Sequence, residues 1–331
     1  MTKVLIIRLS SLGDILQCLP CADLLRQEWP DSEIHWLVKR EFSDTIKSAK
    51  SLNKVIEFDK QTGLFNFIKT VWNLRNERYT HIYDAHSNVR SHIASFLLRL
   101  THPKAFFLRR SKNRFKRWLL FAWRVKLLPT PFLAAKSFTE PLIQWGVSSN
   151  RWPTASVELV ISHQVEKLLA GLSNFVLIAP SAAWELKRWP LEHWQKLVSL
   201  HPQHSFVIVG GPQDQFCQEL ADHHPDNTLN LAGKVNWNET FEVINLATVV
   251  VSGDTGVLHM ADYLQKPTVA LIGPTAFGFP SSPTAQVLEV PLSCRPCTKD
   301  GRGKCKNKIH KRCLTEITPE TVHEQINASL A

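Results

Sequence analysis

Residues 251–261, VSGDTGVLHMA, have the pattern of a strand, a tight turn and a helix. A helix that begins in such a turn has free backbone N–H groups, and its dipole favours an anion. The residues that would present these N–H groups are Thr255, Gly256 and Val257. His259 lies one turn inside the helix, within reach of the same anion. Asp254 either takes part in this site or caps the helix. The stretch is therefore a candidate phosphate site.

Two more predicted strand ends carry groups suited to a nucleotide. In APSAAWELKRWP (179–190), small residues beginning with Ser181 let a ligand approach the backbone, and Lys187 supplies a positive charge. The alternative for Lys187 is a solvated loop lysine. In GGPQD (210–214), Asp214 can accept hydrogen bonds from ribose hydroxyls or cap the following helix.

A different chemistry is indicated by RLSSLGD (8–14), which joins the first predicted strand to a helix. Ser10, Ser11 and Gly13 form a tight turn that leaves space beside the carboxylate of Asp14. This carboxylate is either a helix cap or a catalytic group. The turn lacks the G-x-G-x-x-G pattern, which argues against a dinucleotide-dependent dehydrogenase.

Four of the seven cysteines follow the spacing C-x2-C-x7-C-x7-C near the C-terminus. Four thiolates can hold zinc or, less often, iron, and a site with four protein ligands is structural because no position stays open. Reduced, packed thiols are the alternative. The four residues are Cys294, Cys297, Cys305 and Cys313. Core positions are expected for the other three, Cys18, Cys21 and Cys217.

The net charge of +10 is concentrated in one block, since no Asp or Glu lies between Asp84 and Glu140. Such a block indicates a polyanionic partner: nucleic acid, anionic lipid or a phosphorylated substrate. The block has no RNP aromatic pattern or helix-turn-helix signature, which argues against nucleic acid. Within 104–126, apolar residues recur at helical spacing, as in a segment that lies on an anionic membrane. The alternative is a core helix with a solvated basic face.

Short apolar strands alternate with amphipathic helices along the whole chain, which predicts parallel sheets covered on both faces. In the first half the predicted strands are 3–9, 34–39, 54–59, 81–86 and about 104–108, and the helices are 14–28, 41–48, 64–76 and 90–100. In the second half the predicted strands are 175–180, 205–211, 228–233, 248–254 and 267–273.

Two such sets of elements predict two doubly wound α/β domains, 1–155 and 156–331, and a chain of 331 residues is long enough for both. The C-terminal helix is a candidate for packing back on the first domain. Ligands of parallel sheets bind at the carboxyl ends of the strands, so the motifs are expected around one cleft. No apolar run is long enough to span a bilayer, and no signal peptide is evident, so we expect a cytoplasmic protein.

Taken together, SSLGD, KRWPLEHW, GGPQD and VSGDTGVLHMAD resemble the heptosyltransferases of lipopolysaccharide core assembly, in the same order and spacing. The resemblance extends from residue 3 to about residue 325. It implies a GT-B fold, in which two Rossmann-like domains face each other across a cleft. It also implies inverting transfer from ADP-heptose to a lipid A–Kdo–heptose acceptor at the cytoplasmic face of the inner membrane.

By the same resemblance, the first domain binds the acceptor and the second binds the ADP-sugar. Asp14 matches the catalytic carboxylate, which takes the proton of the acceptor hydroxyl. Lys187 would contact the diphosphate and Asp214 the ribose. Acceptor contacts are expected from Ser10, Ser11 and Arg90. Pyrophosphate and sugar contacts are expected from Ser181, Asp254, Thr255, Gly256, Val257 and His259.

One departure concerns Ala182 and Ala183, which stand where some members have hydroxyl residues, so that Ser181 is the one side-chain donor before Lys187. The chain has no Asp-x-Asp pair, and we expect no cofactor in catalysis, because Lys187 and helix N-termini would replace a metal. Similar cysteine clusters occur in part of the family, consistent with structural zinc or iron. The acceptor sugar stays open between Kdo, the first heptose and a later heptose. Two other functions remain: transfer of another nucleotide-linked sugar, or nucleic-acid binding with a zinc knuckle.

Overall fold

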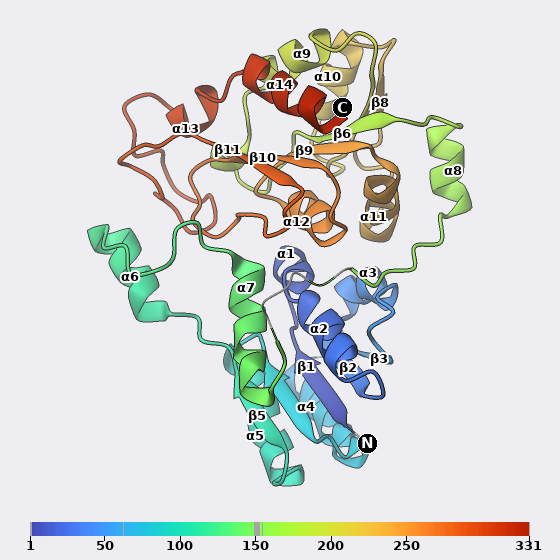
Figure 1. The fold of residues 1–331 in the computed structure, drawn as a ribbon, viewed down its shortest axis with the longest axis vertical. Coiled ribbons are helices and arrows are strands. Elements are labelled where there is room, and N and C mark those ends of the chain that lie inside the picture. The colour runs from blue at the N-terminus through green and yellow to red at the C-terminus, as the bar shows by residue number, and fades with distance from the viewer. Residues whose placement is uncertain (1, 62, 149–152, 154, 331) are drawn as a thin grey trace. The chain divides into compact units, whose positions relative to one another are not determined.

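The strands of the first half are short apolar runs that pair in parallel. The computed structural model describes residues 2–61, 63–148, 153 and 155–330. The first sheet has the order β3-β2-β1-β4-β5 (Figure 1). Its strands are β1 (Lys3–Ile7), β2 (Glu33–Lys39), β3 (Lys54–Phe58), β4 (His81–Asp84) and β5 (Phe106–Arg109). Ile7 lies opposite both Leu37 and Asp84, so the chain leaves β1, β2 and β4 at one edge of the sheet.

A second parallel sheet has the order β11-β10-β9-β6-β7-β8. Its strands are β6 (Phe175–Ala179), β7 (Ser205–Ile208), β8 (Thr228–Asn230), β9 (Val249–Gly253), β10 (Thr268–Ile272) and β11 (Ala285–Glu289). All ten predicted strands are present. The sequence did not indicate β11, because AQVLE alternates only weakly and lies half-exposed at the sheet edge.

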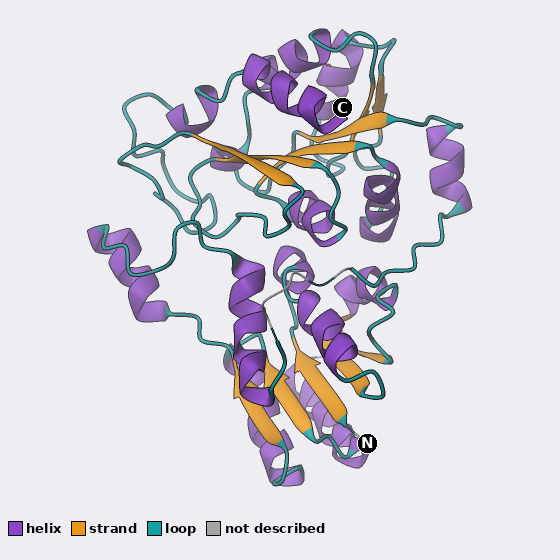
Figure 2. Ribbon diagram, viewed as in Figure 1, coloured by secondary structure: helices purple, strands orange, loops and turns teal. Residues whose placement is uncertain are grey.

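Helices cover both faces of each sheet, which confirms the doubly wound α/β class (Figure 2). In the first half the α-helices are α1 (Leu12–Leu16), α2 (Pro20–Glu28), α3 (Ser43–Lys47), α4 (Gly63–Asn73), α5 (Val89–Thr101), α6 (Arg114–Trp123) and α7 (Ala134–Thr139), with 3-10 turns η1 (Arg40–Phe42), η2 (Leu74–Glu77) and η3 (Glu140–Trp145). The predicted helix 14–28 is wrong in its extent. Two helices occupy the region, because Pro20 has no N–H to continue α1 and is well suited to begin α2.

The helices of the second half bury their apolar faces against the second sheet. They are α8 (His163–Leu169), α9 (Leu191–Ser199), α10 (Phe216–His223), α11 (Trp237–Leu246), α12 (Gly256–Tyr263), α13 (Arg312–Thr315) and α14 (Pro319–Leu330), with a 3-10 turn η4 (Glu185–Lys187). The C-terminal helix α14, a candidate for packing on the first domain, has its buried residues Val322 and Ile326 in the core of the second sheet. In the described part of the chain, no helix is long and apolar enough to cross a membrane.

The chain divides into two compact units, residues 1–114 with 135–158, and residues 115–134 with 159–331. The segment 115–134, which we expected in the first domain, is therefore part of the second unit. Aromatic contacts explain this placement, since the rings of Phe121 and Phe132 lie 6.0 and 5.1 Å from that of Phe277. Each unit has its own apolar core, in which a fully buried Leu or Ile contributes about 1.5–3 kcal/mol.

Candidate active site

The turn between β9 and α12 has the predicted form. The strand ends at Gly253 and the helix begins at Gly256, with Thr255 in the extended conformation that precedes a helix. No side chain caps this helix, and the Thr255 hydroxyl instead lies 3.0 Å from the hydroxyl of Ser252. The N–H groups of the first turn are therefore available to an anion.

Asp254 does not cap α12, so that alternative is wrong. Its carboxylate lies 3.1 Å from Lys187 Nζ, 3.5 Å from His259 Nε2, and 2.6 Å from the Thr275 hydroxyl, which donates to it. Burial alone would raise the pKa of Asp254, but the charge of Lys187 and the hydrogen bonds from His259 and Thr275 hold this pKa well below its usual range. An ionised carboxylate thus faces a lysine whose side chain is only 15% exposed, unlike a solvated loop lysine.

Asp214 accepts hydrogen bonds from residues that follow β6 and β7. The Ser181 hydroxyl and the Gly211 N–H both donate to its Oδ2, the latter over 2.7 Å, and Arg188 Nη2 lies 3.5 Å from Oδ1. The following helix α10 starts two residues later and is not capped by Asp214, so the capping alternative is wrong here also. Sequence reasoning missed Arg188, although the adjacent cations of KRWP were a signal.

The loop after β10 completes the surroundings of Asp254. A Cβ atom on Gly278 would lie 1.9 Å from Asp254 Cγ, so only glycine allows this approach. Thr275, in the same loop, supplies the shortest hydrogen bond to the carboxylate. Neither residue was predicted, because their loop follows a strand without any charged or glycine-rich motif of its own.

In the first unit, Asp14 lies in the first turn of α1, and Ser11, in extended conformation, is the residue that precedes this helix. Arg8 Nη2 lies 2.5 Å from Asp14 Oδ2, and the Ser11 hydroxyl donates to the same oxygen over 3.0 Å. Burial raises the pKa of Asp14, but Arg8 and Ser11 lower it overall, so the carboxylate is ionised at neutral pH. Its side chain is 43% exposed and open to a second ligand.

Cations surround Asp14 at this edge of the first sheet. Arg8 and Arg110 are both buried, and the Arg110 guanidinium stacks 3.6 Å from the ring centre of Phe138. Burial and the charge of Arg8 lower the pKa of Lys112 to about 8. Sequence reasoning missed these three residues as site members, although Arg8 was a charge at the end of an apolar strand. The predicted Arg90 lies in the first turn of α5, two residues after the capping residue Asn88.

The four clustered cysteines line one small cavity together with Leu186 and Pro274. Two of the sulfurs accept hydrogen bonds, Cys305 Sγ from the Lys311 N–H over 3.3 Å and Cys294 Sγ from the Asn307 amide over 3.5 Å. All seven cysteines are unpaired. Cys18, Cys21 and Cys217 are fully buried core residues, as predicted.

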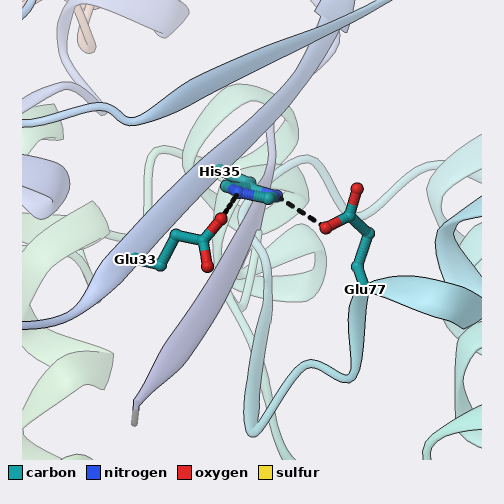
Figure 3. Close-up of side chains that lie close together, drawn as sticks. All are labelled: Glu33, His35 and Glu77. Carbon is teal, nitrogen blue, oxygen red and sulfur yellow. Dashed lines mark hydrogen bonds and ion pairs between the residues drawn. The ribbon is translucent and has the colours of Figure 1, made fainter.

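Glu33, His35 and Glu77 form a separate cluster (Figure 3). Among the residues that the structure describes, these are the three possible metal ligands whose ligand atoms all lie within 4.8 Å of one another. His35 Nε2 is 2.8 Å from Glu33, and its Nδ1 is 2.8 Å from the Tyr79 hydroxyl. The carboxylates already pair with two lysines, Lys3 at 3.1 Å from Glu33 and 2.6 Å from Glu77, and Lys54 at 2.6 Å from Glu77. Two charges of each sign balance, and we interpret the cluster as an ion-pair network that ties the start of β1 to β2 and η2.

The two doubly wound units have the architecture of the GT-B fold. The chain belongs to glycosyltransferase family 9 (heptosyltransferase), whose model matches residues 68–309. The resemblance found in the four motifs is thereby confirmed.

Individual relatives match along almost the whole chain. Lipooligosaccharide heptosyltransferase 2 of Haemophilus ducreyi is 25% identical, with 99% of each chain covered. A family 9 glycosyl transferase from Veillonella parvula superimposes with a TM-score of 0.77 at 19% identity, covering 99% of this chain and 97% of that one. The structure described as E. coli ADP-heptose lps heptosyltransferase II superimposes with a TM-score of 0.71 at 20% identity, covering 99% and 98%.

The Glu77 network leads to a prediction about stability and pH. Hydrogen bonds from Lys3 and Lys54 lower the pKa of Glu77 from 4.5 to about 2. The stabilisation is therefore complete above pH 4.5 and is lost as the pH falls toward 2. We expect Glu77→Gln to lower the free energy of unfolding at pH 7 by about 1–2 kcal/mol, with allowance for solvent screening. Urea unfolding of both proteins between pH 7 and pH 3 should show this difference shrinking.

Glu316→Gln is the matched control, because Glu316 pairs with Arg312 across one turn of an exposed helix end. It should change stability by less than about 0.5 kcal/mol. Equal effects of the two substitutions, or a Glu77→Gln effect that is constant with pH, would contradict the network.

Proposed function

We propose that this glycosyltransferase moves heptose, with inversion, from ADP-heptose to an acceptor of the lipopolysaccharide inner core. The second unit would bind the donor and the first unit the acceptor. The names of its relatives support both substrates, since the curated relative is a lipooligosaccharide heptosyltransferase and the E. coli structure names ADP-heptose.

The observation that carries the proposal is the arrangement of Lys187, Asp254 and His259 beside the uncapped start of α12. A lysine ammonium and a set of free N–H groups are what a diphosphate requires. Lys187 would stabilise the negative charge that develops on the leaving diphosphate. Asp254 keeps that ammonium in place, and Asp214 and Arg188 form a second polar group for the ribose.

Asp14 would act as the base for the acceptor. As the acceptor oxygen forms a bond to the anomeric carbon, the bond from that carbon to the β-phosphate oxygen breaks, and its electron pair leaves with ADP. The acceptor hydroxyl proton goes to Asp14, which is ionised and accessible. The cations Arg8, Arg110 and Lys112, together with Arg90, suit an acceptor that carries carboxylate or phosphate groups.

Substitution of the proposed base separates chemistry from donor binding. Asp14→Asn should reduce transfer by about 10²–10⁴-fold, the usual contribution of general base catalysis, and leave ADP affinity unchanged. Turnover of ADP-heptose with truncated core acceptors, and calorimetry with ADP, measure the two effects. Wild-type turnover by the folded variant would reduce Asp14 to a structural partner of Arg8.

Removal of the donor lysine should affect both ADP binding and transfer. Lys187→Ala should weaken ADP binding by about ten- to hundredfold, since a charge-assisted contact contributes about 1.5–3 kcal/mol. It should also slow transfer. Lys234→Ala, which removes an exposed lysine of the same unit, is the control and should leave ADP affinity unchanged. Unchanged affinity in Lys187→Ala would exclude Lys187 from the donor site.

We also propose that α6 holds the enzyme at the cytoplasmic surface of the anionic inner membrane. Three large apolar residues of α6 are exposed, Phe115 by 68%, Trp118 by 55% and Trp123 by 69%, whereas Leu120 is buried, so α6 packs by one side and leaves an aromatic side open. Phe115 stacks on Trp118, and the ring centre of Trp118 lies 6.3 Å from that of Trp123, so the three rings form one aromatic face. Exposed Arg114 and Lys116 on the same helix would meet lipid phosphates.

Binding to liposomes tests this surface. The protein should sediment with anionic but not zwitterionic liposomes, less so at high salt, and Trp118→Ala with Trp123→Ala should weaken binding by about tenfold or more. Phe65→Ala with Trp72→Ala is the control, because these exposed aromatics lie on α4, which carries one cation, Lys69, against three on α6. Equal effects of the two pairs, or binding indifferent to lipid charge, would exclude α6 as the membrane contact.

For the cysteines we propose one structural zinc or iron ion. The donor set fits, since four thiols line one cavity and two of them already accept hydrogen bonds of the kind that stabilise thiolates. The four sulfur atoms do not all lie within 4.8 Å of one another, so binding of one ion would draw them closer together. The ion would order the loop and supply no open position for substrate.

Elemental analysis of protein purified without added metal should find about one equivalent of zinc or iron. Its removal by a chelator should lower the thermal midpoint, because metal ligation contributes folding free energy. A metal-free preparation with the same thermal midpoint would show that the cysteines are reduced, packed thiols.

A further inference from the structure

We infer that the cysteine-bearing loop 294–313 positions the two charged groups of the donor site, Lys187 and Asp254. This inference rests on the proposed function, because it concerns how the ADP-binding groups are held. The cysteine cavity is lined by Leu186, which precedes Lys187, and by Pro274, which precedes Thr275. The loop thus contacts the segments that carry both sides of the ion pair.

On the lysine side, the contact is made by Gly301. A Cβ atom there would lie 2.7 Å from both Cγ and Cδ of Lys187 and 3.0 Å from the Cβ of Trp184. The backbone of Gly301 therefore packs directly on the aliphatic stem of the lysine. The next residue, Arg302, extends this contact, with its guanidinium 4.7 Å from the ring centre of Trp184.

On the carboxylate side, the loop holds the segment after β10. The Cys297 N–H donates to the Pro274 carbonyl over 3.0 Å. Arg295 Nε donates to the Gly273 carbonyl over 2.6 Å. The residue that follows this doubly anchored segment is Thr275, whose hydroxyl donates to Asp254 over 2.6 Å.

A third link runs through Lys311. Its N–H donates to Cys305 Sγ over 3.3 Å, and its Nζ donates to the Arg188 carbonyl over 3.2 Å and pairs with Glu185 at 2.5 Å. One residue therefore joins a cysteine sulfur to both ends of the turn η4 that carries Lys187.

Rigid support of this kind raises affinity, because a lysine held in its binding conformation loses less conformational freedom when the ligand arrives. Gly301 and Lys311 are thus positioning residues, which act on ADP through Lys187. Substitutions that disturb the contacts of Gly301 or Lys311 should weaken ADP binding, although every group that touches the nucleotide is still present.

Two glycines of the loop provide a matched pair of variants. Gly301 has φ +97° and Gly303 has φ +95°, but a Cβ on Gly303 would meet nothing within 4 Å. Alanine therefore causes the same backbone strain at both positions, and the collision with Lys187 only at Gly301. Calorimetry with ADP should show affinity about three- to tenfold weaker in Gly301→Ala and close to wild type in Gly303→Ala.

A double-mutant cycle shows whether the effect passes through Lys187. In the Lys187→Ala background, Gly301→Ala should cause little further loss of ADP affinity, because the displaced side chain is gone. Lys311→Met, which keeps the stem and removes the ammonium, gives an independent variant and should behave in the same way. Thermal midpoints of all variants identify any that fail to fold.

Equal ADP affinities of Gly301→Ala and Gly303→Ala, or additive losses in the cycle, would overturn the inference while the donor site stands. Wild-type protein that does not bind ADP would instead overturn the proposed function, and this inference with it.

Discussion

The proposed donor site in the second unit depends on one interaction, the pair formed by Lys187 and Asp254. Their charged atoms lie 3.1 Å apart, and both side chains are at least 85% buried. An unpaired charge at such a depth would be strongly unfavourable, so each group requires the other before any substrate arrives. His259, Thr275 and Gly278 gather around the carboxylate for the same reason, because it needs further hydrogen bonds and close packing. A site built in this way presents a fixed positive charge next to the N-terminus of α12.

The proposed acceptor site in the first unit also depends on a carboxylate that is paired with cations. Asp14 is a carboxylate set among cations, with Arg8 at 2.5 Å and Arg110 and Lys112 nearby. Arg8 and Arg110 are buried and therefore structural as well as electrostatic. In both units these charges follow the carboxyl ends of parallel strands, where the chain turns and side chains become free to meet a ligand.

The large positive charge of the chain serves more than one purpose in the fold. Arg110 stacks on Phe138 in the interior of the first unit, and Arg117 stacks on Phe277 at 4.1 Å in the second. Arg114 and Lys116 instead accompany the exposed aromatic rings of α6. The residues of one basic block of sequence therefore take part in packing contacts, in the electrostatics of the candidate site, and in an exposed surface that is both basic and aromatic.

The sequence by itself determined the fold class, the strand positions and the main site motifs. Apolar runs bounded by turns mark parallel strands, and charged or small residues after them mark the ligand edge, because these patterns are local in the chain. Local patterns failed where contacts are distant. The edge strand β11, the membership of 115–134 in the second unit, and the roles of Thr275, Gly278 and Arg188 depend on side chains far away in the chain. Only the tertiary structure decided that Asp214 and Asp254 do not act as helix caps, because each carboxylate has closer partners than the helix ends: Ser181 with Gly211 for Asp214, and Lys187 for Asp254. It also decided that the cysteine loop lies on the stem of Lys187, a contact between residues more than a hundred positions apart that no spacing of motifs can express.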